Sequence, residues 1–110
     1  MTDFDPERFE DKYANYFAEL QRAYKNAFET MNDRFDSELV HAIDQQVLAE
    51  SEPFYEEGCF RVELPENPTD RLTAVVVDEG KARETLDRYV AEIESELYRV
   101  FGLEPPEEEG

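Results

Sequence analysis

Apolar side chains recur every three or four residues through the first third of the chain, and this spacing is the strongest constraint on the fold. Steps of three and four place side chains on one face of an α-helix. Asp5 is a suitable N-cap, Pro6 suits the first helical position, and Phe4 can pack against Phe9 as a hydrophobic staple. We therefore predict one amphipathic helix of about eight turns that begins at Pro6. Its apolar face comprises Phe9, Tyr13, Phe17, Leu20, Tyr24, Phe28, Met31 and Phe35.

A second helix is predicted after a break near residues 32–33. If the first helix continued, its apolar face would drift around the axis, because repeated steps of four exceed the helical period. Asp36 or Ser37 can cap the second helix, which is expected to run to about Ser51 before Pro53 ends it. Its apolar face comprises Leu39, Ile43 and Val47.

Two segments in the middle of the chain have the pattern of β-strands. Residues 60–64 follow Cys59 and alternate apolar with polar side chains, which is typical of a strand with one face in water. Residues 72–77 form an apolar run, as in a strand buried on both faces. The segment 65–70 has loop composition, so we predict an antiparallel hairpin with a long connection.

A third helix is predicted to follow Asp78, a suitable N-cap, and to end at Gly102, which suits a left-handed C-terminal residue. The predicted fold is α+β and mainly helical, in the order α-α-β-β-α, with a two-stranded antiparallel hairpin packed against long amphipathic helices. Residues 1–103 are expected to form a single domain, and residues 104–110 a disordered acidic tail. The apolar face of the third helix comprises Ala82, Leu86, Tyr89, Val90, Ile93, Leu97, Val100 and Phe101.

The chain carries 29 acidic and 11 basic residues, a formal net charge of -18, yet 40% of its residues are apolar and 13% aromatic. Disordered acidic chains lack that apolar content, so the acidic residues are expected to coat a folded core. Eighteen excess charges about 20 Å apart in unscreened water repel one another by about 30 kcal/mol, whereas domains are stable by only about 5–15 kcal/mol. At a Debye length of about 3 Å in molar salt this repulsion almost vanishes, so the composition suits a salt-filled cytoplasm.

The basic residues are eight arginines and only three lysines, and the chain starts with a helical acidic segment, Asp5-Pro6-Glu7-Arg8-Phe9-Glu10-Asp11-Lys12-Tyr13. In these features it resembles the small acidic proteins of halophilic archaea, in particular an uncharacterised family of about this length. The resemblance implies no activity, cofactor or site residue.

Several kinds of chemistry are excluded by composition. Glycines at positions 58, 80, 102 and 110 are too scattered for a dinucleotide fingerprint, a P-loop or a nucleophile elbow. One cysteine and one histidine cannot supply a structural zinc site, and Cys59 cannot form an internal disulfide, so a reducing cytoplasm is expected. The start lacks the pattern of a signal peptide, and no apolar run has the length of a membrane span.

The sharpest candidate for a metal site is Glu38-Leu39-Val40-His41, with Asp44 about one turn further along. This spacing places two ligands on one helix face in di-iron carboxylate bundles, and a homodimer could supply a second set. However, acidic residues are so frequent here that one often precedes the histidine by chance, and His41 lies away from the apolar face. We therefore expect a solvated histidine, no metal and no cofactor. Cys59 is expected to be a small residue at a strand start rather than a nucleophile.

Three functions remain open. The first is a non-enzymatic interaction or assembly module, because long amphipathic helices and a hairpin supply surface but no chemistry. The second is an acidic protein that binds a basic partner, for example by mimicking nucleic acid, and the third is a metal-dependent enzyme using Glu38 and His41. Binding to nucleic acid itself is disfavoured by like charge. We expect a homodimer, formed through strand edges or helix faces, because the hairpin offers too little surface to cover the apolar faces.

Overall fold

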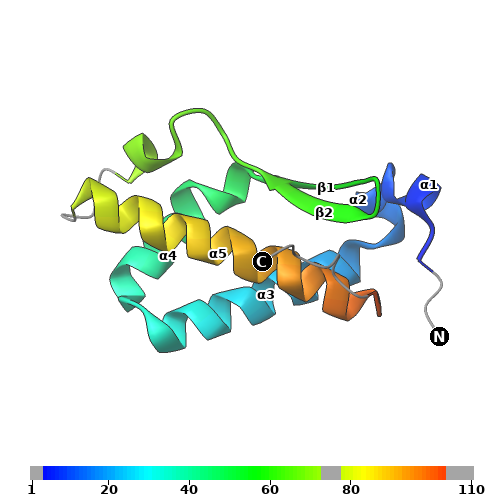
Figure 1. The fold of residues 1–110 in the computed structure, drawn as a ribbon, viewed down its shortest axis with the longest axis horizontal. Helices are drawn as coiled ribbons and strands as arrows, with labels where there is room; N and C mark the ends of the chain where they lie inside the picture. The colour runs from blue at the N-terminus through cyan, green and yellow to red at the C-terminus, as the bar shows by residue number, and fades with distance from the viewer. Residues whose placement is uncertain (1–3, 73–77, 104–110) are drawn as a thin grey trace.

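The computed structural model describes residues 4–72 and 78–103. Five α-helices, two strands and two 3-10 turns follow one another in these residues (Figure 1). The elements are α1 (Pro6–Phe9), α2 (Lys12–Asn15), α3 (Phe17–Arg34), α4 (Ser37–Gln46), η1 (Leu48–Glu50), β1 (Glu52–Glu56), β2 (Cys59–Glu63), η2 (Pro68–Arg71) and α5 (Glu79–Val100). The α+β, mainly helical fold with a two-stranded antiparallel hairpin is confirmed.

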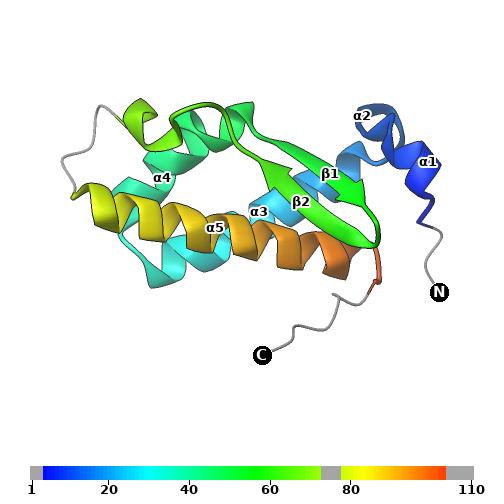
Figure 2. The same cartoon turned by 45° about the horizontal axis from the view of Figure 1, so that its top comes forward.

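The two long helices, α3 and α5, lie side by side and run in opposite directions (Figures 1 and 2). The hairpin covers them at the end where α3 begins and α5 finishes, and α4 packs against them towards the other end (Figure 2). The largest fully buried side chains come from α3, from α4 with the residue after it, and from α5: Met31, Leu39, Val40, Ile43, Val47, Leu86, Tyr89, Ile93 and Leu97. The apolar faces predicted for the second and third helices therefore form the core.

The predicted first helix is broken twice, at Asp11 and at Tyr16, where the backbone leaves the helical region (φ -115°, ψ 48° and φ -131°, ψ 25°). The prediction of one continuous helix from Pro6 is therefore wrong. The breaks turn the chain so that Phe9 and Tyr16 pack against Phe101, with ring centroids 5.9 and 5.0 Å away. Burial of these rings at the end of the hairpin outweighs the few helical hydrogen bonds that are lost.

The buried face of the segment from α1 to α3 is also displaced from the predicted one. Its members are spaced by three and four residues but include small and charged side chains: Phe9, Lys12, Tyr16, Leu20, Ala23, Ala27 and Met31. Ala23 and Ala27 lie at the centre, where small side chains allow α5 to pack closely. The large rings expected there are half-buried, as Tyr24 and Phe28 are, or more than half exposed, as Tyr13 and Phe17 are.

The break between the first long helix and α4 is confirmed. α3 ends at Arg34, and the Asp36 carboxylate accepts a hydrogen bond of 3.0 Å from the Glu38 backbone N–H as the N-cap of α4. α4 is shorter than predicted because it ends at Gln46 and is followed by the 3-10 turn η1.

The hairpin uses a different first strand from the one predicted. β2 pairs antiparallel with β1, the segment that precedes it, through the two-residue turn Glu57-Gly58. Both turn residues have positive φ (51° and 83°), as the tight turns of hairpins require. The other strand predicted, residues 72–77, lies outside the described residues except for Leu72, which is buried. The acidic tail, residues 104–110, also lies outside the described residues.

Pro53 lies within β1, although it was expected only to end a helix. It faces Val62 in the register, and this pair is the third one beyond the hydrogen-bonded Glu56–Cys59 pair that closes the turn. Alternation along the ladder makes Pro53 and Val62 a non-hydrogen-bonded pair, so the nitrogen of Pro53 faces away from β2 and no ladder bond is lost.

The third predicted helix is confirmed with both of its caps. The Asp78 carboxylate accepts a hydrogen bond of 3.2 Å from the Lys81 N–H at the start of α5. At its end Gly102 has φ 68°, and the Leu103 N–H donates to the Tyr98 carbonyl at 2.8 Å. This pattern is a Schellman motif, which glycine favours because it has no Cβ.

Side chains of α5 cover the outer edge of β2. The Tyr98 hydroxyl accepts a hydrogen bond of 2.9 Å from the Phe60 N–H, and the Glu94 carboxylate accepts one of 3.1 Å from the Val62 N–H. These two N–H groups are the ones that β1 leaves unpaired. A second chain cannot add to this edge without displacing α5, so pairing through the edge of β2 is not a route to a dimer.

Candidate functional site

The three candidate metal ligands, Glu38, His41 and Asp44, all lie on α4. Glu38 is exposed, and His41 is exposed with its Nδ1 atom 2.9 Å from the Ser37 carbonyl oxygen. The His41 ring packs edge-on against Phe28, with centroids 4.9 Å apart. Within residues 4–72 and 78–103, no three His, Cys, Asp or Glu side chains are grouped so that they could hold a metal ion.

Asp44, the third candidate, is half-buried at the edge of the core. The buried Tyr89 hydroxyl donates a long hydrogen bond of 3.5 Å to its carboxylate. Burial raises the pKa of Asp44, and burial together with the Asp44 carboxylate raises the pKa of Tyr89. This pair satisfies a buried hydroxyl between α4 and α5, and the nearby His41 opposes part of the rise in the Asp44 pKa.

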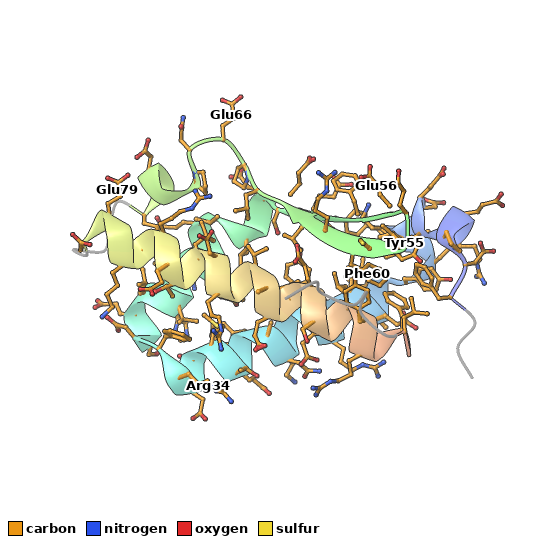
Figure 3. All side chains as sticks on the ribbon, viewed as in Figure 1. Arg34, Tyr55, Glu56, Phe60, Glu66 and Glu79 are labelled. Carbon is orange, nitrogen blue, oxygen red and sulfur yellow. The ribbon has the colours of Figure 1, made fainter. Side chains whose placement is uncertain are left out.

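Cys59 is exposed and is the first residue of β2, where the sequence places it. It lies next to Phe60, whose ring belongs to an aromatic cluster at the end of the hairpin nearest α1. Tyr55 and Phe60 meet there with centroids 4.9 Å apart (Figure 3). The other rings of the cluster come from α1 and the residues before it, from the break before α3, and from the last turn of α5 and its C-cap: Phe4, Phe9, Tyr16, Tyr98 and Phe101.

Lys12 lies beside this cluster and is the one described basic residue with a buried side chain, only 5% exposed. Its ammonium donates a hydrogen bond of 2.9 Å to the Glu52 carboxylate on β1. The same nitrogen lies 5.0–5.5 Å from the ring centroids of Phe9, Tyr13 and Phe54. Aromatic faces attract a cation, so the three rings replace much of the hydration that Lys12 loses. The sequence did not predict that Lys12 is buried, because the pattern used to find a buried helix face contains only apolar side chains.

Tyr13 also borders an apolar groove of about 230 Å³, which runs between α3 and the chain that leads into β1. We call it the aromatic groove and define it by its lining residues: Tyr13, Phe17, Leu20, Gln21, Tyr24, Ala49, Ser51 and Pro53. Tyr13 and Phe17 are 55% and 52% exposed and are the large apolar side chains that the described part of the chain leaves most open to solvent. They were predicted to be core, and the breaks around α2 are what turn them outwards.

The floor of the aromatic groove is fixed by polar contacts. The hydroxyl groups of Tyr24 and Ser51 lie 3.1 Å apart, and Ser51 in turn donates to the Leu48 carbonyl at 2.7 Å. Burial raises the pKa of Tyr24 to about 12, although the Ser51 hydroxyl opposes the shift. Burial and then the nearby Glu52 carboxylate raise the pKa of Tyr13. The groove is therefore a preformed surface with neutral tyrosines and lacks a group poised for acid–base chemistry.

Comparison with known proteins agrees with the expectation of an uncharacterised family. No curated protein and no solved structure matches the chain. No helix among the described residues has the length and apolarity to cross a bilayer. A family model described as a family of unknown function, DUF5783, matches residues 1–104, nearly the whole chain. The chain therefore belongs to the DUF5783 family.

Proposed function

We propose that the protein is a non-enzymatic interaction module that works in a salt-filled cytoplasm, and that the aromatic groove is its contact surface. The observation that carries this proposal is the exposure of Tyr13 and Phe17 beside a preformed apolar groove. A chain with 29 acidic residues has ample polar side chains to cover its surface. Two exposed aromatic side chains next to each other therefore favour contact with a partner.

A homodimer is the assembly that we propose. A basic partner is a weaker alternative, because residues 12–28, which form one side of the groove, contain three basic residues and one acidic residue. An enzyme that uses Glu38 and His41 has no support from their placement, since both side chains are exposed on α4 and are not joined by a third ligand among the described residues.

Chemical cross-linking in molar KCl tests the proposal. The tagged protein is cross-linked in a cell extract that also contains the untagged chain. The wild-type protein is expected to give discrete cross-linked species whose contacts map to residues 13–24 and 49–53. Substitution of both rings, Tyr13→Ser with Phe17→Ser, should remove these species. A control with the exposed residues Asn32→Ser and Ala91→Ser should keep them. Equal yields from all three proteins, each with unchanged circular dichroism, would contradict the proposal.

A further inference from the structure

The segment that carries Tyr13 and Phe17 has a charge unlike that of the rest of the chain. Residues 12–28 contain three basic residues, Lys12, Arg22 and Lys25, and one acidic residue, Glu19. The remaining residues contain 28 acidic and eight basic residues. Two copies of this chain repel each other over most of their surfaces, so the face of α2 and α3 is where that repulsion is weakest.

Charges of opposite sign flank the two sides of the aromatic groove. Arg22 and Lys25 lie on the side of α3 that faces away from β1, where they line a second hollow together with Gln21 and Tyr24 of the groove. We call this pair the basic rim. Glu50 and Glu52 alternate in sequence with the groove residues on the opposite side, and we call them the acidic rim. Glu52 also accepts the hydrogen bond from the Lys12 ammonium of its own chain, which offsets part of the charge of this rim.

We propose that the occupant of the aromatic groove is the same groove of a second copy, related by a two-fold axis. A two-fold axis that runs along the groove places each side of the groove against the opposite side of the groove in the other copy. The basic rim of one copy then faces the acidic rim of the other, twice, while Tyr13 and Phe17 of each copy are covered. This inference rests on the proposed function and names the partner.

The local charge selects a second copy over other occupants. A basic protein or peptide would be drawn to the acidic surfaces formed by the rest of the chain rather than to the segment with an excess of basic residues. An acidic partner without a basic rim of its own would satisfy Arg22 and Lys25 but would meet Glu50 and Glu52 with like charge. A surface with both rims satisfies both sides of the groove, and this chain has one.

Sedimentation equilibrium in about 1 M KCl, where repulsion is screened to about 3 Å, tests the inference. The wild-type protein is expected at twice the 12.9 kDa chain mass. Tyr13→Ser with Phe17→Ser should be monomeric. Arg22→Glu with Lys25→Glu should weaken the dimer about tenfold in about 0.3 M KCl and less in about 1 M KCl, because the same salt screens the exposed rim charges. The matched control, Arg83→Glu with Arg88→Glu on the exposed face of α5, makes the same change in net charge and should change the dimer constant less than about twofold.

A charge exchange identifies which rims meet. Mixing the Arg22→Glu, Lys25→Glu chain with a Glu50→Lys chain should form a heterodimer more stable than either homodimer. Circular dichroism of each variant confirms that it is folded.

Three results would overturn the inference: a wild-type monomer up to high micromolar concentration, a dimer that survives loss of both rings, or an equal effect of the α5 control. The first result removes the proposed homodimer as well, but it leaves the interaction module standing if the cross-linked species of the wild-type protein contain a different partner and still require Tyr13 and Phe17. If the wild-type protein also gives no cross-linked species that depend on these rings, the proposed function fails as well.

Discussion

Lys12 is the residue whose placement most affects the candidate surface. Its ammonium joins α2 to β1 through Glu52, and its neighbouring ring Tyr13 borders the aromatic groove. A charge with so little exposure is stable only because a carboxylate and three aromatic faces surround it. Lys12 thus holds the broken first segment against the hairpin, and that placement keeps Tyr13 turned outwards.

Removing this charge while keeping the side-chain length should destabilise the protein. We expect Lys12→Met to lower the free energy of unfolding by about 1–2 kcal/mol, since a charge-assisted hydrogen bond and the ring contacts are lost while half-exposed Glu52 regains water. Urea denaturation at fixed high salt measures the difference. Lys25→Met, at an exposed position of α3, should change stability by less than about 0.5 kcal/mol. Equal effects of the two substitutions would show that the buried contacts of Lys12 contribute nothing.

Asp44 should make stability depend on pH in an unusual direction. Burial raises its pKa above the ordinary value of 3.8, so the folded protein holds this proton more tightly than the unfolded chain does. The stability that the protonated Asp44 carboxyl contributes is therefore fully present below the ordinary pKa and is lost as pH rises through the raised pKa of the folded protein. Asp44→Asn should raise the thermal midpoint at pH 7 by about 2 °C, and the gain should shrink as pH falls towards 4.

Differential scanning calorimetry from pH 7 to 4 checks this expectation. Asp33→Asn removes the same formal charge from an exposed position at the end of α3 and should give a smaller gain at pH 7. A lower midpoint for Asp44→Asn at pH 7 would mean that the hydrogen bond from Tyr89 to the ionised carboxylate outweighs the burial of its charge.

At the scale of the elements, the contact between α5 and the edge of β2 joins the hairpin to the helices. Tyr98→Phe removes the acceptor of the buried Phe60 N–H and should lower the free energy of unfolding by about 1–3 kcal/mol. Amide hydrogen exchange supplies an internal control, because the Val62 N–H keeps its acceptor on Glu94. Protection should fall at Phe60 more than at Val62. An equal fall at both amides would mean that the hairpin is held by packing alone.

The caps and the regular apolar faces made α4 and α5 predictable. Asp36, Asp78 and Gly102 each have a local function that depends only on neighbouring backbone groups, so their positions are readable from the chain. Leu39 and Leu86 likewise belong to faces without an interruption, and both are fully buried.

The first helix and the hairpin depend on contacts between distant segments, which a periodic pattern does not contain. The series through Tyr13 and Phe17 suggested a core face, but burial of Tyr16 against Phe101 decided the path of the chain. Pro53 indicated only the end of a helix, and a strand is possible there because its nitrogen faces away from β2 in the register found. The aromatic groove forms because the first helix is broken and because the chain around Pro53 enters a strand. Neither feature could be predicted from the sequence, so the groove could not be predicted as a site.

At the scale of the whole molecule, the excess of acidic residues should make folding depend on salt. The Cα radius of gyration is 14.3 Å, so opposite faces of the domain lie within a few Debye lengths of each other at low ionic strength. Dialysis from molar to millimolar KCl should reduce helicity measured by circular dichroism and lower the thermal midpoint, because screening is lost. Replacing KCl by NaCl at equal ionic strength should leave both unchanged. A constant helicity and midpoint throughout dialysis would contradict this expectation.

The account as a whole depends on Tyr13 and Phe17 being contact residues that a second copy covers. Hydroxyl-radical footprinting in about 1 M KCl, at low and at high micromolar protein concentration, measures their exposure directly. We expect labelling of both rings to fall as concentration rises, while labelling of half-buried Phe28 and Tyr55, which lie outside the groove, stays constant. Labelling of Tyr13 and Phe17 that is independent of concentration over the same range would contradict the account.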